Sequence, residues 1–290
     1  MSSSLDGATS DRASSNNASM SASEQLDQHI RRLATMLLEA LHATLSHRDR
    51  LEVKVKTSAH DLVSNADRSI EKLILDLTRA VFPADGFLGE ESGWASRSMD
   101  GRNWIVDPVD GTMNFVHGFP IACSSVGVLE SGRAIAGLIV DPYRDDVYLA
   151  CQGVSRSQKN DRIISVSSGD DLAGQIVLVE VPSGVSPSIL APVQDAVIAA
   201  GGSPRTIGSG ALALALVASG VVHGVVHACP SIWDVAGGVA LVEQAGGVVL
   251  SRRGPYVVGE VGPLVAASPE AAQRLQSALS ACVLRDLRGS

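Results

Sequence analysis

The residue types best suited to chemistry gather in the middle of the chain. Asp107 and Asp110 follow a short apolar run, Trp104–Val106, that is typical of a buried strand. Carboxylate oxygens at a strand end are the ligands that hard cations such as Mg²⁺ prefer. Gly111 and Thr112 come next and suit the start of a helix, where unpaired backbone N–H groups can hold a phosphate. The stretch therefore predicts a metal-dependent phosphate site.

Asp-Pro and Asp-Gly pairs are also ordinary turn signals, so the two aspartates alone fit a simple turn. Further acids of the same kind favour the metal interpretation. Asp67, Glu90 and Asp234 each lie at an apolar strand end or a helix start. Asp67 also fits a helix-capping role, which is the simpler interpretation of that residue by itself.

Composition excludes some classes of protein. The net charge is −8 at pH 7, whereas nucleic-acid-binding proteins usually present a basic face. No apolar run reaches the ~20 residues that span a bilayer, and the Ser-rich start lacks the apolar segment of a secretory signal. The 4 cysteines form no Cys-x-x-Cys pair. We therefore expect a reduced, cytoplasmic protein that binds neither nucleic acid nor membrane.

Helical and strand patterns alternate around these acids. Apolar residues recur at helical spacing from Leu26 to Leu45, with Ser23 as the predicted cap, and short apolar runs predict strands, one of them Ile163–Val166. Residues 94–102 suit an exposed loop. We predict a mixed α and β (α+β) fold with helices layered over sheets. The expected divisions are a disordered tail (1–23), a metal-binding α+β domain (24–150) and a substrate-binding α/β domain (151–288).

Three motifs in order carry a resemblance that covers roughly residues 24–285. They are Gly89-Glu90-Glu91-Ser92, then Asp-Pro-x-Asp-Gly-Thr-x-Asn-Phe within Trp104–Pro120, then Trp233-Asp234-x-Ala236-Gly237 with Glu243-x-Ala245-Gly246-Gly247. The set resembles the inositol monophosphatase-like family of Mg²⁺-dependent, lithium-sensitive phosphatases. The resemblance implies a layered αβαβα sandwich of the inositol monophosphatase and fructose bisphosphatase type. It also implies a homodimer and two to three Mg²⁺ ions per site, with Mn²⁺ as an alternative.

Matched position by position, the resemblance assigns roles to residues of this chain. The implied metal ligands are Glu90, Asp107, the Val109 carbonyl, Asp110 and Asp234. The implied catalytic residues are Thr112 and Asp67, which orient and deprotonate the attacking water, with Glu90. The implied substrate-binding residues are Gly111, Thr112, Gly208, Ser209, Gly210, His227 and Asp234.

Two positions depart from the family pattern. His227 stands where inositol phosphatases of the family place a sugar-binding glutamate, and Gly208-Ser209-Gly210 stands in place of Gly-Thr-Ala. His227 is a different hydrogen-bonding partner, or else a packed strand residue. Lys56 falls where the family has a basic residue on a mobile loop. The alternative is that it is simply an exposed lysine on a strand.

These observations predict a phosphomonoester hydrolase for a small metabolite: an inositol monophosphate, a sugar phosphate or histidinol phosphate. Two alternatives stay open. One is a nucleotide-type 3′-phosphatase of the same fold, and the other is a non-catalytic regulatory protein built on it.

Overall fold

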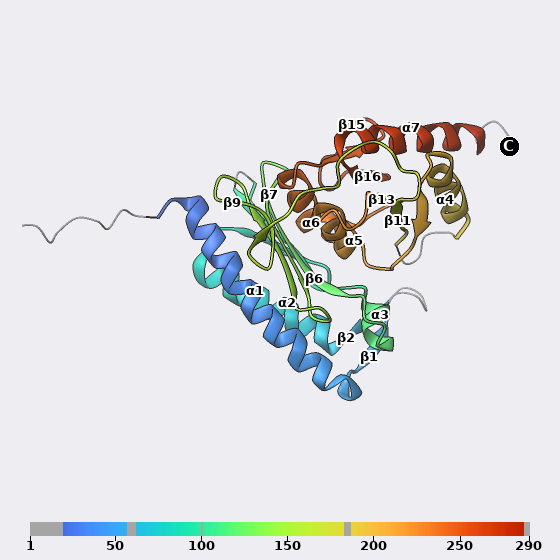
Figure 1. Ribbon diagram of the computed structural model, residues 1–290. Helices are drawn as coiled ribbons and strands as arrows, with labels where there is room; N and C mark the ends of the chain where they lie inside the picture. Colours follow the sequence, from blue (N-terminus) through green and yellow to red (C-terminus); the bar gives the residue numbers. More distant parts are fainter. Residues whose placement is uncertain (1–19, 57–61, 100, 183–186, 287–290) are drawn as a thin grey trace, which may run out of the picture.

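The protein is described by a computed structural model, which covers residues 20–56, 62–99, 101–182 and 187–286. Helix pairs and sheets alternate through it as helices, sheet, helices, sheet and helices (Figure 1). The layered αβαβα architecture expected from the sequence is confirmed. Among the described residues, no helix is long and apolar enough to cross a membrane.

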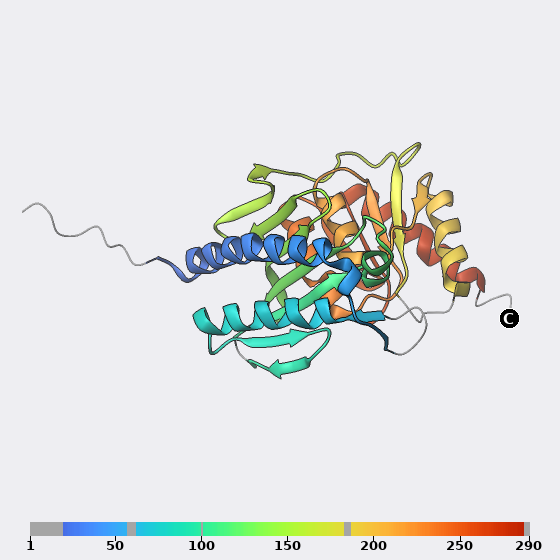
Figure 2. The ribbon, with the colours of Figure 1, turned by 90° about the horizontal axis from the view of Figure 1, so that it is seen from below.

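The first layer is a pair of long helices, α1 (Ala22–Ser46) and α2 (Asn65–Val81). Ser21 caps α1 in a capping box with Glu24, which satisfies backbone N–H groups at the helix start. Figure 2 shows the two helices side by side across one face of the large sheet. Their apolar faces are buried against it, and each buried Leu or Ile contributes about 1.5–3 kcal/mol.

The second layer is an eight-stranded sheet in the spatial order β10-β9-β8-β7-β6-β5-β3-β4. Neighbouring strands are antiparallel except β3 and β5, which run parallel. Its strands are β3 (Gly86–Gly89), β4 (Gly93–Ser96), β5 (Arg102–Asp110), β6 (Cys123–Glu130), β7 (Arg133–Asp141), β8 (Asp146–Cys151), β9 (Ser155–Lys159) and β10 (Arg162–Ile163).

Two buried helices, α5 (Gly210–Ala218) and α6 (Ile232–Gln244), lie between the sheets. The backbone of α6 touches the large sheet directly. A Cβ on Gly127 would lie 2.5 Å from the Ala236 carbonyl carbon, and one on Gly237 would lie 2.9 Å from the Val126 carbonyl oxygen. Only glycine permits such an approach. The contact fixes α6, which carries Asp234, against strands β5 to β7.

The fourth layer is a six-stranded sheet in the order β12-β11-β13-β16-β14-β15, in which β11 is parallel to both of its neighbours. Helices α4 (Leu190–Ala199) and α7 (Pro269–Asp286) cover its outer face. Its strands are β11 (Ile176–Glu180), β12 (Ser203–Arg205), β13 (Gly224–His227), β14 (Val248–Ser251), β15 (Gly254–Pro255) and β16 (Leu264–Ala267).

Five short elements complete the described chain. Strands β1 and β2 pair only with each other, as an antiparallel ribbon. The elements are β1 (Val53–Val55), β2 (Leu62–Ser64), the single-turn helices η1 (Arg48–Arg50) and η2 (Pro187–Ile189), and the short helix α3 (Thr112–His117).

Three local expectations need correction. The cap of α1 is Ser21 and not Ser23, because Glu24 lies where it completes the box with Ser21. Part of the expected loop at 94–102 is strand, since β4 pairs with β3. Of the expected strand Ile163–Val166, only Ile163 is in a strand. It belongs to β10, which pairs with β9 at the edge of the large sheet.

The predicted domain division stays a prediction. The large sheet continues through β9 and β10, beyond the proposed boundary at residue 150. Of the proposed tail, residues 1–19 lie outside the described residues, and the last residues before 24 already belong to α1 and its cap.

Candidate functional site

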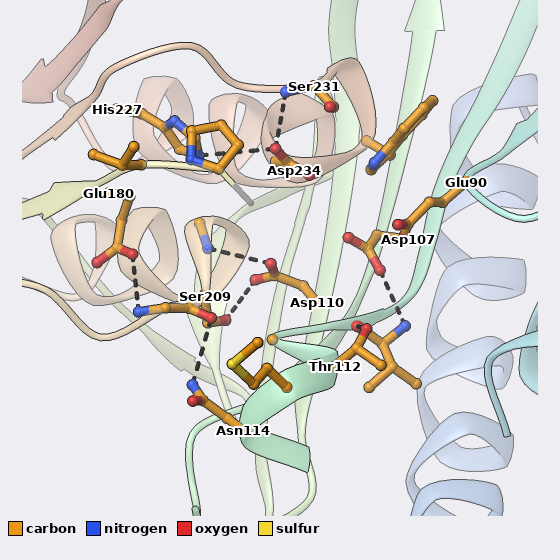
Figure 3. Close-up of a pocket in the computed structure, with 18 of the residues that line it drawn as sticks. Glu90, Asp107, Asp110, Thr112, Asn114, Glu180, Ser209, His227, Ser231 and Asp234 are labelled. Carbon is orange, nitrogen blue, oxygen red and sulfur yellow. Dashed lines mark hydrogen bonds and ion pairs between the residues drawn. The ribbon is translucent and has the colours of Figure 1, made fainter. Parts of the chain in front are cut away.

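A cavity of about 400 Å³ opens between the two sheets. Both sheets and the inner helices contribute to it, as the labelled side chains in Figure 3 show. Its lining comprises Lys56, Glu90, Asp107, Val109, Asp110, Gly111, Thr112, Met113, Asn114, Glu180, Val181, Pro182, Gly208, Ser209, Gly210, His227, Ser231, Trp233 and Asp234. Every residue predicted for the site lines this cavity except Asp67, which lies behind Thr112.

A bulge in β5 places the two central aspartates. Strand β5 is in register with β6 up to Asp107, opposite Ser125, and resumes with Asp110 opposite Cys123. The extra residue on β5 is a β-bulge, which changes the direction of side chains next to it. Asp107 Oδ1 accepts a hydrogen bond from the Val109 N–H at 3.0 Å across the bulge. Both carboxyl groups consequently face the cavity (Figure 3).

The carboxyl groups that line the cavity repel one another when they are ionised. Burial raises the pKa of Asp107, and the charges of Glu90 and Asp110 raise it further. Burial, followed by the charge of Asp110, raises the pKa of Asp234 to about 8. The pKa of Glu90 is also raised, mainly by burial. Ionised together, these groups need a compensating positive charge.

The donor set suits a hard divalent cation. Two buried carboxylates (Asp107 and Asp110), two partly buried ones (Glu90 and Asp234) and the Val109 carbonyl share one cavity, and oxygen donors are what Mg²⁺ binds. Among the residues that the structure describes, no three His, Cys, Asp or Glu side chains already form a group that could hold an ion. Two of the acids are engaged elsewhere. Glu90 pairs with Lys56, and Asp110 accepts several hydrogen bonds.

Thr112 and Asp67 form the pair that the sequence predicted. Thr112 Oγ1 lies 3.3 Å from Asp67 Oδ1 and 2.8 Å from the Val109 carbonyl oxygen, so its one proton can serve either acceptor. Asp67 Oδ2 accepts bonds from the Ser64 N–H and hydroxyl at 2.8 and 2.6 Å. Asp67 therefore belongs to the capping box of α2 and also contacts Thr112, and its catalytic role stays a prediction. Burial raises its pKa.

Gly111 permits the turn that delivers Thr112. Its φ of 83° lies in the left-handed region, which L-residues with a Cβ avoid. A Cβ here would also lie 3.0 Å from the Ile121 carbonyl oxygen. The glycine thus allows β5 to pass directly into α3 at Thr112.

The opposite wall is built around the segment 207–211. Asp110 accepts bonds from Ser209 Oγ at 2.5 Å and from the Ala211 N–H at 2.8 Å, which caps α5. Asn114 Nδ2 donates to the Ile207 carbonyl at 2.8 Å. These bonds join two stretches about a hundred residues apart in sequence.

Glu180 holds the same segment from the other side and is a site residue that the sequence reasoning missed. Its carboxyl oxygens accept the Ile207 N–H at 3.0 Å and the Gly208 N–H at 2.9 Å. Burial raises its pKa to about 8. The signal was present in the sequence, because Glu180 ends an apolar strand as Asp107 does.

His227 lies deep in the wall beside Asp234. It is 3% exposed, and its Nε2 is 3.9 Å from Asp234 Oδ2. Burial lowers its pKa to about 3, so the ring is neutral. A Cβ on Gly210 would lie 2.7 Å from His227 Nε2. The two departures from the family pattern therefore touch each other.

Comparisons with known proteins agree with the fold. A model of the Inositol monophosphatase family matches residues 22–284. The chain is 32% identical to the Nus factor SuhB of Pasteurella multocida, over 81% of this chain and 88% of that one. It is 33% identical to the inositol-1-monophosphatase of Bacillus subtilis, over 78% and 86%.

A solved structure gives the same result. The extragenic suppressor protein suhB from Bartonella henselae superposes with a TM-score of 0.81 at 31% identity, covering 88% of this chain and 98% of that one. Since the family match spans nearly the whole described chain, this protein belongs to the inositol monophosphatase family.

Proposed function

We propose that the protein is a Mg²⁺-dependent phosphomonoester hydrolase acting on a small phosphorylated metabolite. The observation that carries the proposal is one cavity that joins four mutually repelling carboxyl groups to the Thr112–Asp67 pair. Membership of a family of phosphatases supports it. We include in the proposal inhibition by lithium, Mn²⁺ as an alternative ion and assembly as a homodimer.

In this proposal the chain supplies ligands on both sides of the cavity. Glu90, Asp107 and the Val109 carbonyl would hold one cation, and Asp110 and Asp234 would share a second with Asp107. When bound, divalent cations supply positive charge that favours ionisation of water and offsets the charge of the phosphate. The ligand set also explains why acids that repel one another are kept together.

In this proposal, side chains orient the attacking water and accept its proton. Thr112 Oγ1 orients the attacking water and passes a proton to Asp67, whose raised pKa suits a proton acceptor. The water oxygen attacks phosphorus, the ester P–O bond breaks, and the alcohol leaves with a proton from solvent. Ser64 holds the Asp67 carboxyl group in place throughout. The Gly111 and Thr112 N–H groups would contact the phosphate.

The cavity favours a substrate that carries a single phosphate group. Its volume suits an inositol monophosphate, a sugar phosphate or histidinol phosphate. Lys56 is the one Lys or Arg among the lining residues, and it is already paired with Glu90. A nucleotide carrying a second phosphate would therefore lack a cationic partner among the described lining residues, which ranks the nucleotide-type alternative lower.

The test is phosphate release from a panel with Mg²⁺, with and without lithium. The panel holds inositol 1-phosphate, histidinol phosphate, fructose 1,6-bisphosphate and adenosine 3′,5′-bisphosphate. We expect release from a monophosphate that is lost with a chelator. Preference for adenosine 3′,5′-bisphosphate would favour the alternative, and no release from any compound would contradict the proposal.

A second candidate is a regulatory role, because relatives about a third identical carry the name Nus factor. Asp107→Asn separates the two functions. This substitution removes a proposed ligand but keeps the side-chain shape. If cells that lack the protein are complemented by Asp107→Asn as well as by the wild type, the required function is regulatory. Failure of a folded Asp107→Asn variant favours catalysis.

A further inference from the structure

Lys56 reaches into the acidic cavity from outside the two sheets. Its Nζ lies 2.8 Å from Glu90 Oε1 and also bonds the carboxylate of Glu91. The side chains are largely shielded, with 21% of Lys56 and 20% of Glu90 exposed. Opposite charges held at this degree of burial interact more strongly than on an open surface. The ammonium group therefore offsets one of the two negative charges of the acid pair.

The two glutamates are fixed by their backbone. The Glu90 N–H donates to the Val106 carbonyl at 3.0 Å, which continues the β3–β5 pairing. The Glu91 N–H donates to Glu71 on α2 at 2.8 Å, and the Ser92 N–H donates to the same carboxylate at 3.0 Å. A Cβ on Gly89 would overlap that carboxylate. This turn has little room to shift.

The segment that carries Lys56 is attached more lightly. Lys56 follows β1, whose one partner among the described strands is β2. All three residues of β1 are exposed, and Val53 and Val55 keep 40% and 60% of their surface in solvent. An exposed strand such as β1 opens more readily than the buried strands of the two sheets. When the ion pair separates, Lys56 is therefore the partner that moves.

We propose that Lys56 is the built-in counter-cation of the Glu90–Glu91 pair and that a divalent cation binding at Glu90 displaces its ammonium group. The inference rests on the proposed function, because Glu90 is there a ligand. Two cations cannot share the Glu90 oxygens without strong repulsion. Lys56 thus lowers the affinity of the site for divalent ions while partly compensating the charge of the metal-free acids.

The experiment measures Mg²⁺ binding to the full chain by titration calorimetry with MgCl₂ alone. Lys56→Met removes the internal cation and should tighten binding by about fivefold to tenfold, the scale of a partly buried ion pair. Lys56→Arg keeps a cation at Glu90 and should bind Mg²⁺ within about twofold of wild type. Lys56→Gln repeats the test if Lys56→Met does not fold.

Lys54 provides the matched control, since it is an exposed lysine on the same ribbon. Lys54→Met removes the same charge at a distance and should leave Mg²⁺ affinity within about twofold of wild type. If Lys54→Met and Lys56→Met increase the affinity for Mg²⁺ equally, the cause is the net charge of the ribbon and the proposal is overturned. Unchanged or weaker binding by Lys56→Met would overturn it too.

Thermal unfolding supplies a second readout that needs no substrate. Without Mg²⁺, Lys56→Met leaves the acids uncompensated and should melt below wild type. Saturating Mg²⁺ should then raise its melting temperature by more than that of wild type. If the wild type and every variant bind no Mg²⁺, the metal assignment itself fails. If the wild type binds and Lys56→Met binds no tighter, only the role of Lys56 fails.

Discussion

On the wall formed by the eight-stranded sheet, Asp107 accepts one short-range backbone bond and faces three other carboxyl groups. Across the cavity, Glu180 accepts two backbone N–H groups of the segment 207–211. Both residues are buried acids at the ends of apolar strands. Their surroundings differ because one faces other acids and the other faces donors.

The difference separates two uses of the same residue type. A carboxyl group among other carboxyl groups is destabilising until a ligand arrives, which indicates binding or catalysis. A carboxyl group that completes backbone hydrogen bonds holds a loop in place. Substitutions on the first wall should therefore change activity more than stability, and those on the second wall should change stability more than chemistry.

The largest effect is expected from Thr112→Ala. Loss of the hydroxyl removes the group that orients water and should lower kcat by about a hundredfold to ten-thousandfold. The free energy of unfolding should change little, because Thr112 is partly exposed. Steady-state phosphate release and thermal melting measure the two quantities. Thr112→Ser keeps the hydroxyl and should retain most activity; equal losses in both variants would contradict the assignment.

Glu180→Ala should act mainly on stability. It leaves the Ile207 and Gly208 N–H groups without their acceptor, and each buried unsatisfied group costs about 1–3 kcal/mol. We expect a loss of roughly 2–4 kcal/mol in the free energy of unfolding, measured by urea denaturation. Glu180→Gln keeps one acceptor oxygen and should lose about half as much. A loss below 1 kcal/mol for Glu180→Ala would refute the holding role.

Gly210→Ala should be destabilising only while His227 is present. The new Cβ would lie 2.7 Å from His227 Nε2, and such overpacking typically costs about 1–3 kcal/mol. In the double variant with His227→Ala the clash disappears, so the two effects should not add. Denaturation of both single variants and the double variant gives the coupling energy. Additive effects would show that the two residues are independent.

The last prediction, the smallest when it is counted per pH unit, is a pH dependence of the metal-free protein. The pKa of Glu180 is about 8 when folded, against an ordinary value of 4.5, so the folded state binds a proton that the unfolded state releases between these values. Stability should therefore be highest below pH 4.5 for this group and fall toward pH 8, by at most about 1.4 kcal/mol per unit. Glu180→Gln should flatten the slope. An unchanged slope would contradict a raised pKa.

Sequence patterns predicted helices layered over sheets, and the family resemblance predicted the αβαβα order and most of the cavity lining. The acids at strand ends were found because a strand that stops at a carboxylate leaves a local signature, as at Asp107 and Glu90. Strand β9 was missed because Ser155–Lys159 is polar and has no apolar alternation. It forms through pairing with β8 and through Ser155, which donates to Asp27 on α1 at 2.5 Å.

Contacts between residues far apart in sequence cannot be predicted from local sequence patterns, and the reason is physical. The bond from Ser209 to Asp110 exists because α5 packs between the two sheets, and no spacing within either segment encodes that packing. The pairing of Lys56 with Glu90 likewise depends on where the ribbon lies. The roles given to these residues in catalysis and metal binding stay predictions.

The contact of Gly127 and Gly237 with neighbouring backbone has a consequence for ion choice. Asp234 lies in the first turn of α6 and Asp107 lies near the end of β5, so their separation follows from how closely α6 approaches the sheet. Backbone atoms that are packed against each other cannot move apart as a side chain can change rotamer, so the site cannot widen easily for a larger ion. Mg²⁺ demands short, regular oxygen distances, whereas Ca²⁺ accepts longer and more varied ones. We therefore expect the span between the two carboxylates to discriminate ions by radius.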